Sequence, residues 1–178
     1  GVGTLNSWVR TNLFVNNGNY NAYMTRENIG MGNTSQDWLI TPQISVSSFN
    51  EKLFFSSRST LAGNHGTLYQ IRVSTAPIQS DLSNYTVIQT YTENQFNPYQ
   101  HEEKSIDLQA FAGQSIYIAF VHIYTQPTAL LGGDRWVLDD IYIAHESMYN
   151  PNNTLILNAF LDINNDGIKE ENEQDFSL

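Results

Sequence analysis

The chain has 178 residues, of which 18 are acidic and 8 are basic, so its formal net charge is -10 at pH 7. An acidic surface repels phosphate groups, which argues against nucleic acid as a partner. No apolar run approaches the roughly 20 residues that cross a bilayer, so we expect no membrane insertion. Cysteine is absent, which excludes disulfides, thiolate zinc sites and a cysteine nucleophile.

Short runs rich in β-branched and aromatic residues alternate with clusters of Asn, Gly, Ser and Pro, a pattern typical of strands joined by turns. The expected strands are 21–26, 37–41, 52–59, 68–74, 86–91, 103–108, 115–125, 135–145 and 154–161. Many short strands at regular spacing predict an all-β protein, built as an antiparallel sandwich or barrel.

Four further stretches refine this picture. The run 115–124 is apolar on both faces, which predicts a central strand. The stretch 81–85 predicts one helical turn at most. The glycine-containing stretches 63–66 and 130–134 predict hairpin turns.

The chain changes character near its C-terminus. The stretch 148–153, MYNPNN, is rich in turn residues and predicts a linker. The last 17 residues then contain six acids, which are Asp162, Asp166, Glu170, Glu171, Glu173 and Asp175. We therefore expect one domain over residues 1–147 and the first strand and loop of a following domain over 154–178.

The segment 162–173, DINNDGIKEENE, matches the calcium-loop pattern D-x-[DN]-x-[DN]-G-x5-E at every specified position. Calcium prefers six to eight oxygen ligands. The predicted ligands are Asp162, Asn164, Asp166, the carbonyl of Ile168, Glu170 directly or through water, and Glu173. The alternative is a solvated acidic loop without a metal. A helix–loop–helix hand is not expected, because the residues before the loop predict a strand and only five residues follow Glu173.

Two adjacent aspartates interrupt the apolar strand 135–145, in the stretch WVLDDIYIAHE. Successive side chains of a strand point to opposite faces, so one of Asp139 and Asp140 should point inward. A buried carboxylate is destabilising unless it is paired, and basic residues are scarce in this chain. We favour calcium as the partner. The alternative is a β-bulge, where one aspartate accepts backbone amides and the other faces water.

No arrangement typical of an active site appears in the sequence. A G-x-S-x-G motif is absent, and the four histidines are scattered without metal-ligand spacing. His122 lies within the predicted central strand, which favours a hydrogen-bonded core residue. Trp8, Trp38 and Trp136 are candidates for a sugar-stacking platform, although the interpretation we favour is that they fill the core. We expect no enzymatic activity.

Four blocks of the chain occur in a recognisable order: DWLITPQISV at 37–46, TLYQIRVSTA at 67–76, HEEKSIDLQAFAGQSIYIAFVHIY at 101–124 and WVLDDIYI at 136–143. In this order they resemble the cleaved-adhesin domain of gingipain haemagglutinin regions and the related choice-of-anchor J domains. Within these blocks, 38–42 matches the family's W/Y-L-[IV]-[ST]-P motif and 138–141 matches its L-D-D-[IV] motif. The A-F-R-H motif matches 119–122, with Val121 in place of Arg. The similarity covers residues 6–146.

This resemblance implies a jelly-roll sandwich akin to MAM domains, bound structural calcium and a non-enzymatic adhesive role at the cell surface. The family's opening strand, which carries F-E, has no counterpart before Ser7 and Trp8. If that strand carries calcium ligands in the family, we expect the implied calcium site to be either incomplete or filled by another segment. The tail at 160–173 resembles the opening of a calcium-binding, Ig-like repeat of the SdrD B-type family.

Two functions follow from these expectations. The leading one is a secreted or cell-surface binding module of a multidomain bacterial protein, stabilised by calcium, which contacts a host protein, the matrix or a glycan. The alternative is an accessory or spacer domain of a secreted hydrolase without a ligand of its own. In both cases the flanking domains of the same polypeptide are its neighbours.

Overall fold

The computed structural model describes residues 6–47, 50–130, 132–145, 159–160 and 175–176. The chain divides into two compact units, Gly1–Met148 and Tyr149–Leu178. In the second unit, strand β11 (Ala159–Phe160) pairs with strand β12 (Asp175–Phe176) in antiparallel orientation. The predicted calcium ligands of the tail lie outside the described residues: Asp162, Asn164, Asp166, Ile168, Glu170 and Glu173.

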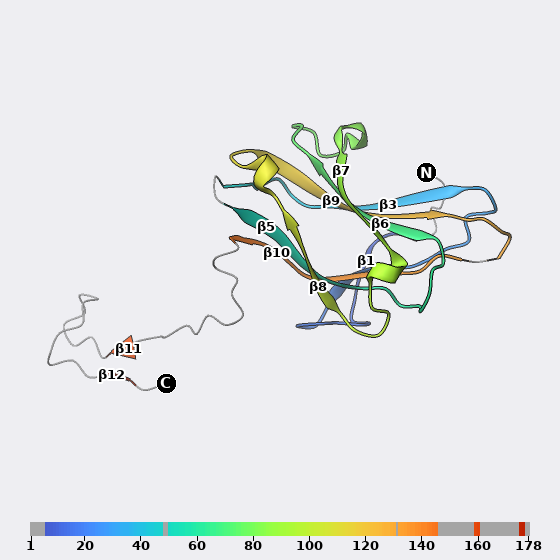
Figure 1. Cartoon of the computed structure of the whole chain (residues 1–178), viewed down its shortest axis with the longest axis horizontal. Helices are drawn as coiled ribbons and strands as arrows, with labels where there is room; N and C mark the ends of the chain where they lie inside the picture. The colour runs from blue at the N-terminus through green and yellow to red at the C-terminus, as the bar shows by residue number, and fades with distance from the viewer. Residues whose placement is uncertain (1–5, 48–49, 131, 146–158, 161–174, 177–178) are drawn as a thin grey trace. The chain divides into compact units, whose positions relative to one another are not determined.

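The first unit is built from two antiparallel sheets that face each other (Figure 1). One sheet has the strand order β1-β2-β10-β5-β8. Its strands are β1 (Val9–Thr11), β2 (Asn21–Met24), β10 (Trp136–His145), β5 (Glu51–Arg58) and β8 (Glu102–Asp107). The second sheet has the order β3-β9-β6-β7, and β4 pairs with β9 beside β3. Its strands are β3 (Thr34–Ile40), β9 (Ser115–Thr125), β6 (Thr67–Ser74), β7 (Thr86–Thr92) and β4 (Ile44–Ser45).

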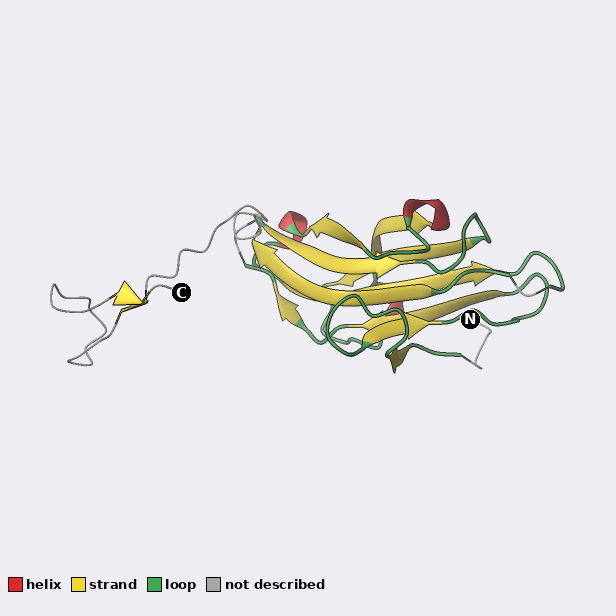
Figure 2. Cartoon of the chain, turned by 90° about the horizontal axis from the view of Figure 1, so that it is seen from below, coloured by secondary structure: helices red, strands yellow, loops and turns green. Residues whose placement is uncertain are grey.

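Helical structure in the described residues is limited to three single turns of 3-10 helix. They are η1 (Leu82–Asn84), η2 (Glu93–Gln95) and η3 (Gln109–Phe111), drawn in red among the yellow strands of Figure 2. The first coincides with the predicted turn at 81–85. Within the described part of the chain, no helix has the length and apolar character that crossing a membrane requires.

The core lies between the two sheets, because alternate residues of each strand point inward. Leu53 and Phe55 of β5 meet Ile118 and Phe120 of β9 in this layer, and all four are almost fully buried. Trp136 has no exposed surface and lies with its ring centroid 5.1 Å from that of Tyr69, 5.9 Å from that of Phe120 and 6.4 Å from that of Phe96. Aromatic burial on this scale is a major stabilising contribution to a small sandwich.

The predicted antiparallel jelly-roll sandwich is confirmed, and β9 is a central strand as expected. The predicted hairpin turns are wrong, however. The stretch 63–66 connects β5 to β6 and the stretch 130–134 connects β9 to β10, and each connection passes from one sheet to the other. Glycine-rich turns permit a tight reversal but do not decide whether the next strand pairs with the previous one.

Candidate functional site

The two adjacent aspartates lie at a β-bulge in β10. The register of β10 on β5 shifts between Asp139 and Tyr142, and Asp140 adopts a left-handed backbone conformation with a φ of 46°. A bulge inserts an extra residue into one strand and changes the direction of the side chains beside it. Asp139 is therefore buried, with 8% of its surface exposed, and Asp140 is only half-buried.

Backbone amides surround the Asp139 carboxylate. Its Oδ2 accepts hydrogen bonds from the amides of Asn16 at 2.8 Å and Asn17 at 3.2 Å, and its Oδ1 accepts one from the amide of Asp140 at 2.9 Å. The Asp140 carboxylate accepts one hydrogen bond, from Asn16 Nδ2 at 2.9 Å. Hydrogen bonds to a carboxylate stabilise its charged form, so Asp139 has a partner without a cation.

Three N–H groups bond to the two oxygens of the Asp139 carboxylate. Among the described residues there is no group of three or more His, Cys, Asp or Glu side chains that could hold a metal ion. Calcium at Asp139 and Asp140 stays a prediction, and so does calcium in the tail.

The loop between β1 and β2, residues 12–20, lies over the outer face of the first sheet, and Asp139 is one of its anchors. Asn21 Nδ2 donates to the Leu13 carbonyl at 2.5 Å. A His101 ring nitrogen, Nε2, lies 2.6 Å from the Phe14 carbonyl, and the Arg58 guanidinium lies 4.8 Å from the centre of the Phe14 ring. These contacts fix a long loop that contains few apolar anchors of its own.

An open pocket of about 410 Å³ lies beside this loop. Its wall combines aromatic and aliphatic side chains with four polar residues: Trp8, Val9, Arg10, Tyr20, Asn21, Ala22, Leu39, Leu138, Asp139, Asp140 and Ile141. This volume falls within the range of small-ligand sites, which combine apolar walls with a few fixed polar groups. The structure thus brings together three of the predicted site residues, Trp8, Asp139 and Asp140.

The pocket wall contains one exposed aromatic ring and one buried polar atom without a partner. The Tyr20 side chain is 51% exposed, and the Arg10 guanidinium lies 3.9 Å from the centre of its ring. The Oδ1 atom of Asn21 is buried without a hydrogen-bond partner in the described part of the structure. This oxygen is shielded from solvent, so it lies behind the pocket surface, out of reach of a ligand.

The three tryptophans have different positions. Trp136 fills the core, and its indole donates to Ser57 Oγ at 2.8 Å. Trp8 is half-buried at the pocket, where its indole donates to the Asp37 carbonyl at 3.1 Å. Trp38 lies on the outer face of the second sheet, with the Arg72 guanidinium 4.6 Å from its ring centre. They do not form one platform, and only Trp8 lines the pocket.

Two groups that face each other on the paired strands β3 and β9 are electrostatically perturbed. Burial, with a smaller contribution from nearby Glu27, raises the pKa of Asp37 to about 6. His122 lies opposite Asp37 in the β3–β9 register, and burial lowers the pKa of its ring to about 4. Its Nε2 lies 2.8 Å from the Asp134 carbonyl, which confirms the predicted hydrogen-bonded core histidine.

Sequence reasoning missed Arg10 and Tyr20. Strand β1 has only three residues, VRT, and was not predicted because so short a run carries no clear alternation. Tyr20 follows a cluster of Asn and Gly that indicated a loop. The one sequence signal for this site was Tyr20 itself. It is an aromatic residue at the end of a polar loop, where a role in the buried core is not expected.

A scan against models of protein families gives no match. A search of curated protein sequences gives no match either.

Several solved structures have a similar fold. The K1 cleaved adhesin domain of Lys-gingipain from Porphyromonas gingivalis W83 matches with a TM-score of 0.56 and 20% identity, over 80% of this chain and 86% of that one. The module CBM27-1 of Caldicellulosiruptor saccharolyticus, solved with mannohexaose, matches with a TM-score of 0.50 and 13% identity, over 78% and 82%. The glycoside hydrolase domain of Endo-D from Streptococcus pneumoniae R6 matches with a TM-score of 0.54 and 15% identity, over 80% of this chain and 20% of that one.

These matches show the fold. The predicted resemblance to cleaved-adhesin domains is confirmed at that level, and carbohydrate-binding modules of the β-sandwich superfamily share the same architecture.

Proposed function

We propose that the first unit is a non-catalytic binding module whose pocket beside Asp139 and Asp140 takes a neutral saccharide. The observation that carries the proposal is the half-exposed Tyr20 ring in a pocket whose wall also contains the polar residues Arg10, Asp139 and Asp140. A sugar ring has an apolar C–H face that packs on an aromatic ring and hydroxyl groups that donate hydrogen bonds. The sandwich likeness to a module solved with mannohexaose supports this ligand class.

The charges of the pocket favour a neutral ligand over an anionic one. Asp139 and Asp140 face one basic side chain, Arg10, in the pocket wall. The whole chain carries a formal charge of -10, so an acidic glycan would meet repulsion at long and short range. Neutral mannans, xylans and glucans therefore fit better than sulfated or uronic-acid polymers.

Electrophoresis of the native chain in gels that contain mannan, xylan or mixed-linkage glucan tests this site. We expect the wild-type chain to be retarded in at least one gel. Tyr20→Ala should weaken that retardation about ten-fold, which corresponds to ~1.4 kcal/mol of binding free energy. Tyr20→Phe keeps the ring and should behave as the wild type does. Equal retardation of wild type and Tyr20→Ala in every gel, or no retardation in any gel, would contradict the proposal.

The accessory or spacer role is the second candidate. One observation favours it, because the same fold covers one-fifth of the length of a chain described as a glycoside hydrolase domain. A spacer needs no ligand, so this role predicts that none of the polysaccharide gels retards the chain. Both roles place the protein outside the cell, secreted or at the surface, where polysaccharides, host proteins and matrix are accessible.

Calcium is a further part of the proposal, and it concerns the tail. The segment 162–173 supplies the oxygen ligands that calcium prefers, from Asp162 to Glu173. The ion would order this segment by drawing its carboxylates and carbonyl together.

A further inference from the structure

A second pocket lies at the opposite edge of the first sheet, in the loop that leads from β7 through η2 to β8. Its volume is about 550 Å³, and its wall consists of Asn94, Gln95, Phe96, Asn97, Pro98, Tyr99 and Glu102. Amide side chains dominate this wall, whereas aliphatic side chains dominate the first pocket. The two pockets share no lining residue.

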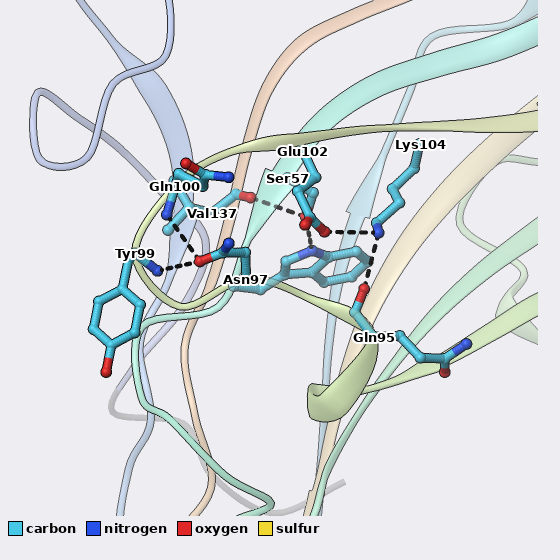
Figure 3. A network of polar contacts seen from close by, with 9 residues as sticks. Ser57, Gln95, Asn97, Tyr99, Gln100, Glu102, Lys104 and Val137 are labelled. Atoms are coloured by element: carbon cyan, nitrogen blue, oxygen red, sulfur yellow. Dashed lines mark hydrogen bonds and ion pairs between the residues drawn. The ribbon is translucent and has the colours of Figure 1, made fainter.

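The start of this loop is fixed by the packing of Phe96 and by the contacts of Lys104. Phe96 is buried, with its ring centroid 5.0 Å from that of Tyr69 and 5.3 Å from that of Tyr91. Lys104 Nζ donates to the Gln95 carbonyl at 2.8 Å and lies 3.1 Å from a Glu102 carboxylate oxygen, as Figure 3 shows.

The tip of the loop is also fixed. Asn97 Oδ1 accepts hydrogen bonds from the amides of Tyr99 at 2.9 Å and Gln100 at 3.3 Å (Figure 3). This turn, closed by an Asn side chain, sets the backbone conformation locally. The Arg58 guanidinium donates to the carbonyls of Pro98 and Tyr99, the latter at 3.1 Å. Together these contacts preorganise the loop, which lowers the entropy that binding would lose.

Tyr99 is the exception in this ordered loop. Its side chain is 79% exposed, although its backbone is held on both sides. No hydrogen bond, aromatic contact or cation contact of the Tyr99 ring occurs within the described residues, and in Figure 3 the ring points away from the other side chains drawn. An exposed aromatic ring on a rigid backbone is a binding anchor, because fixing its two side-chain torsions loses little entropy.

Polar groups with free capacity line the same pocket as Tyr99. The Asn97 amide uses its oxygen within the turn, which leaves its Nδ2 as a donor. Asn94 is exposed, and its side chain has no hydrogen-bond partner in the described part of the chain. The Glu102 carboxylate has one oxygen on Lys104 and a second available as an acceptor. The amide side chains of Asn94 and Asn97 and the carboxylate of Glu102, which share one pocket with Tyr99, can exchange hydrogen bonds with the hydroxyls of a saccharide chain.

The geometry points to a second saccharide-binding site in this loop, with Tyr99 as the stacking residue and Asn94, Asn97 and Glu102 as hydrogen-bonding residues. The proposed ligand is neutral, because the Glu102 carboxylate would repel an anionic sugar. A chain with two such sites binds a long polysaccharide at both, which raises its retention beyond that of either site alone. This inference shares its ligand class with the proposed function but rests on different residues.

The test uses the full chain in the mannan, xylan and mixed-linkage glucan gels, with variants of each pocket. We expect Tyr99→Ala to be retarded at least five-fold more weakly than the wild type in a gel that retards the wild type. Tyr99→Phe should match the wild type. Ile78→Ala, which removes another exposed apolar side chain from the second sheet's connecting loop, should have no effect.

The double variant separates the two proposals. If both sites bind, each single variant should keep part of the retardation of the wild type. The double variant Tyr20→Ala/Tyr99→Ala should lose it. A loss with Tyr99→Ala but not with Tyr20→Ala would support this site and overturn the first. Equal retardation of wild type and Tyr99→Ala in every gel, or an equal loss with Ile78→Ala, would overturn the Tyr99 site. Circular dichroism melting of Tyr99→Ala should match the wild type, because the side chain packs on no described neighbour.

Discussion

At the scale of single residues, the buried carboxylate of Asp139 is stabilised by the backbone of a neighbouring loop. Three amides donate to it, and the amide donors come from Asn16, Asn17 and Asp140. These contacts correspond to the β-bulge alternative of the sequence analysis, in which one aspartate accepts backbone amides. The left-handed conformation of Asp140 is one that Asp and Asn tolerate better than most residues.

The two aspartates should therefore respond differently to the same substitution. Asp139→Asn replaces one acceptor oxygen with a donor that faces an amide, so it should lower the free energy of unfolding by about 1–3 kcal/mol. Asp140→Asn keeps a residue that tolerates the positive φ and should change stability by less than about 0.5 kcal/mol. Urea unfolding followed by tryptophan fluorescence measures both. Equal effects of the two substitutions would contradict the amide-anchor interpretation.

The raised pKa of Asp37 gives a pH dependence with a defined sign. The folded-state pKa of about 6 lies above the ordinary value of 3.8, so the folded state binds more protons than the unfolded state between these values. Stability should then decrease as pH rises from about 4 to about 6. Asp37→Asn should remove this contribution, which melting curves at a series of pH values would detect as a flatter profile. An identical profile in the variant would show that Asp37 titrates normally.

At the scale of structural elements, three buried carboxylates anchor two connections in the same way. Asp134, fully buried, accepts from the amides of Thr60 at 3.1 Å and Leu61 at 2.9 Å. Glu93 accepts from the amides of His65 and Thr67, the latter at 2.7 Å. Both carboxylates hold the crossover from β5 to β6, as Asp139 holds the loop between β1 and β2.

Glu93 offers the clearest test of this role. Glu93→Gln places a donor beside two amides that also donate, so one buried N–H group loses its acceptor. The free energy of unfolding should fall by about 1–3 kcal/mol. Chemical denaturation of the variant measures the change, and a stability equal to that of the wild type would show that the crossover does not depend on this carboxylate.

The elements themselves were more predictable than their connections. Strands such as β9 and β5 carry long apolar runs, so their existence follows from composition and alternation alone. The short strands β1 and β4 carry no such signal, and their pairing comes from the sheets beside them. The sequence predicted hairpins at the crossovers 63–66 and 130–134, because glycine indicates a turn but does not indicate whether the two strands beside it pair with each other. The pocket depends on β1 and its loop, so it was the least predictable part.

At the scale of the whole molecule, the two candidate sites lie at opposite edges of the first sheet. The first is lined mainly by β1, β2 and β10, and the second by the loop that leads to β8. Function on such a fold is decided by the loops, so the shared architecture with adhesin domains and carbohydrate-binding modules shows the scaffold and leaves the ligand to experiment.

Calcium can be tested separately from the sandwich. If the tail binds calcium, Glu173→Ala and Asp162→Ala should each abolish one bound ion of modest affinity, with a dissociation constant on the order of 10⁻⁴ to 10⁻³ M. The melting transition of the first unit should stay the same, because its carboxylate anchor at Asp139 uses amides. Isothermal titration showing equal stoichiometry in wild type and Glu173→Ala would contradict the tail site.

The central claim is that a neutral saccharide binds beside Tyr20, and the three tryptophans provide the most direct measurement. The indole N–H groups of Trp8, Trp38 and Trp136 give three separate signals in a ¹H–¹⁵N correlation spectrum. Mannohexaose is titrated into the labelled chain if mannan retards it, and the matching xylo- or gluco-oligosaccharide otherwise. We predict that the Trp8 signal shifts while the signals of Trp38 and Trp136 stay in place, since only Trp8 lines the pocket. A shift of the Trp38 signal with an unmoved Trp8 signal would contradict the claim.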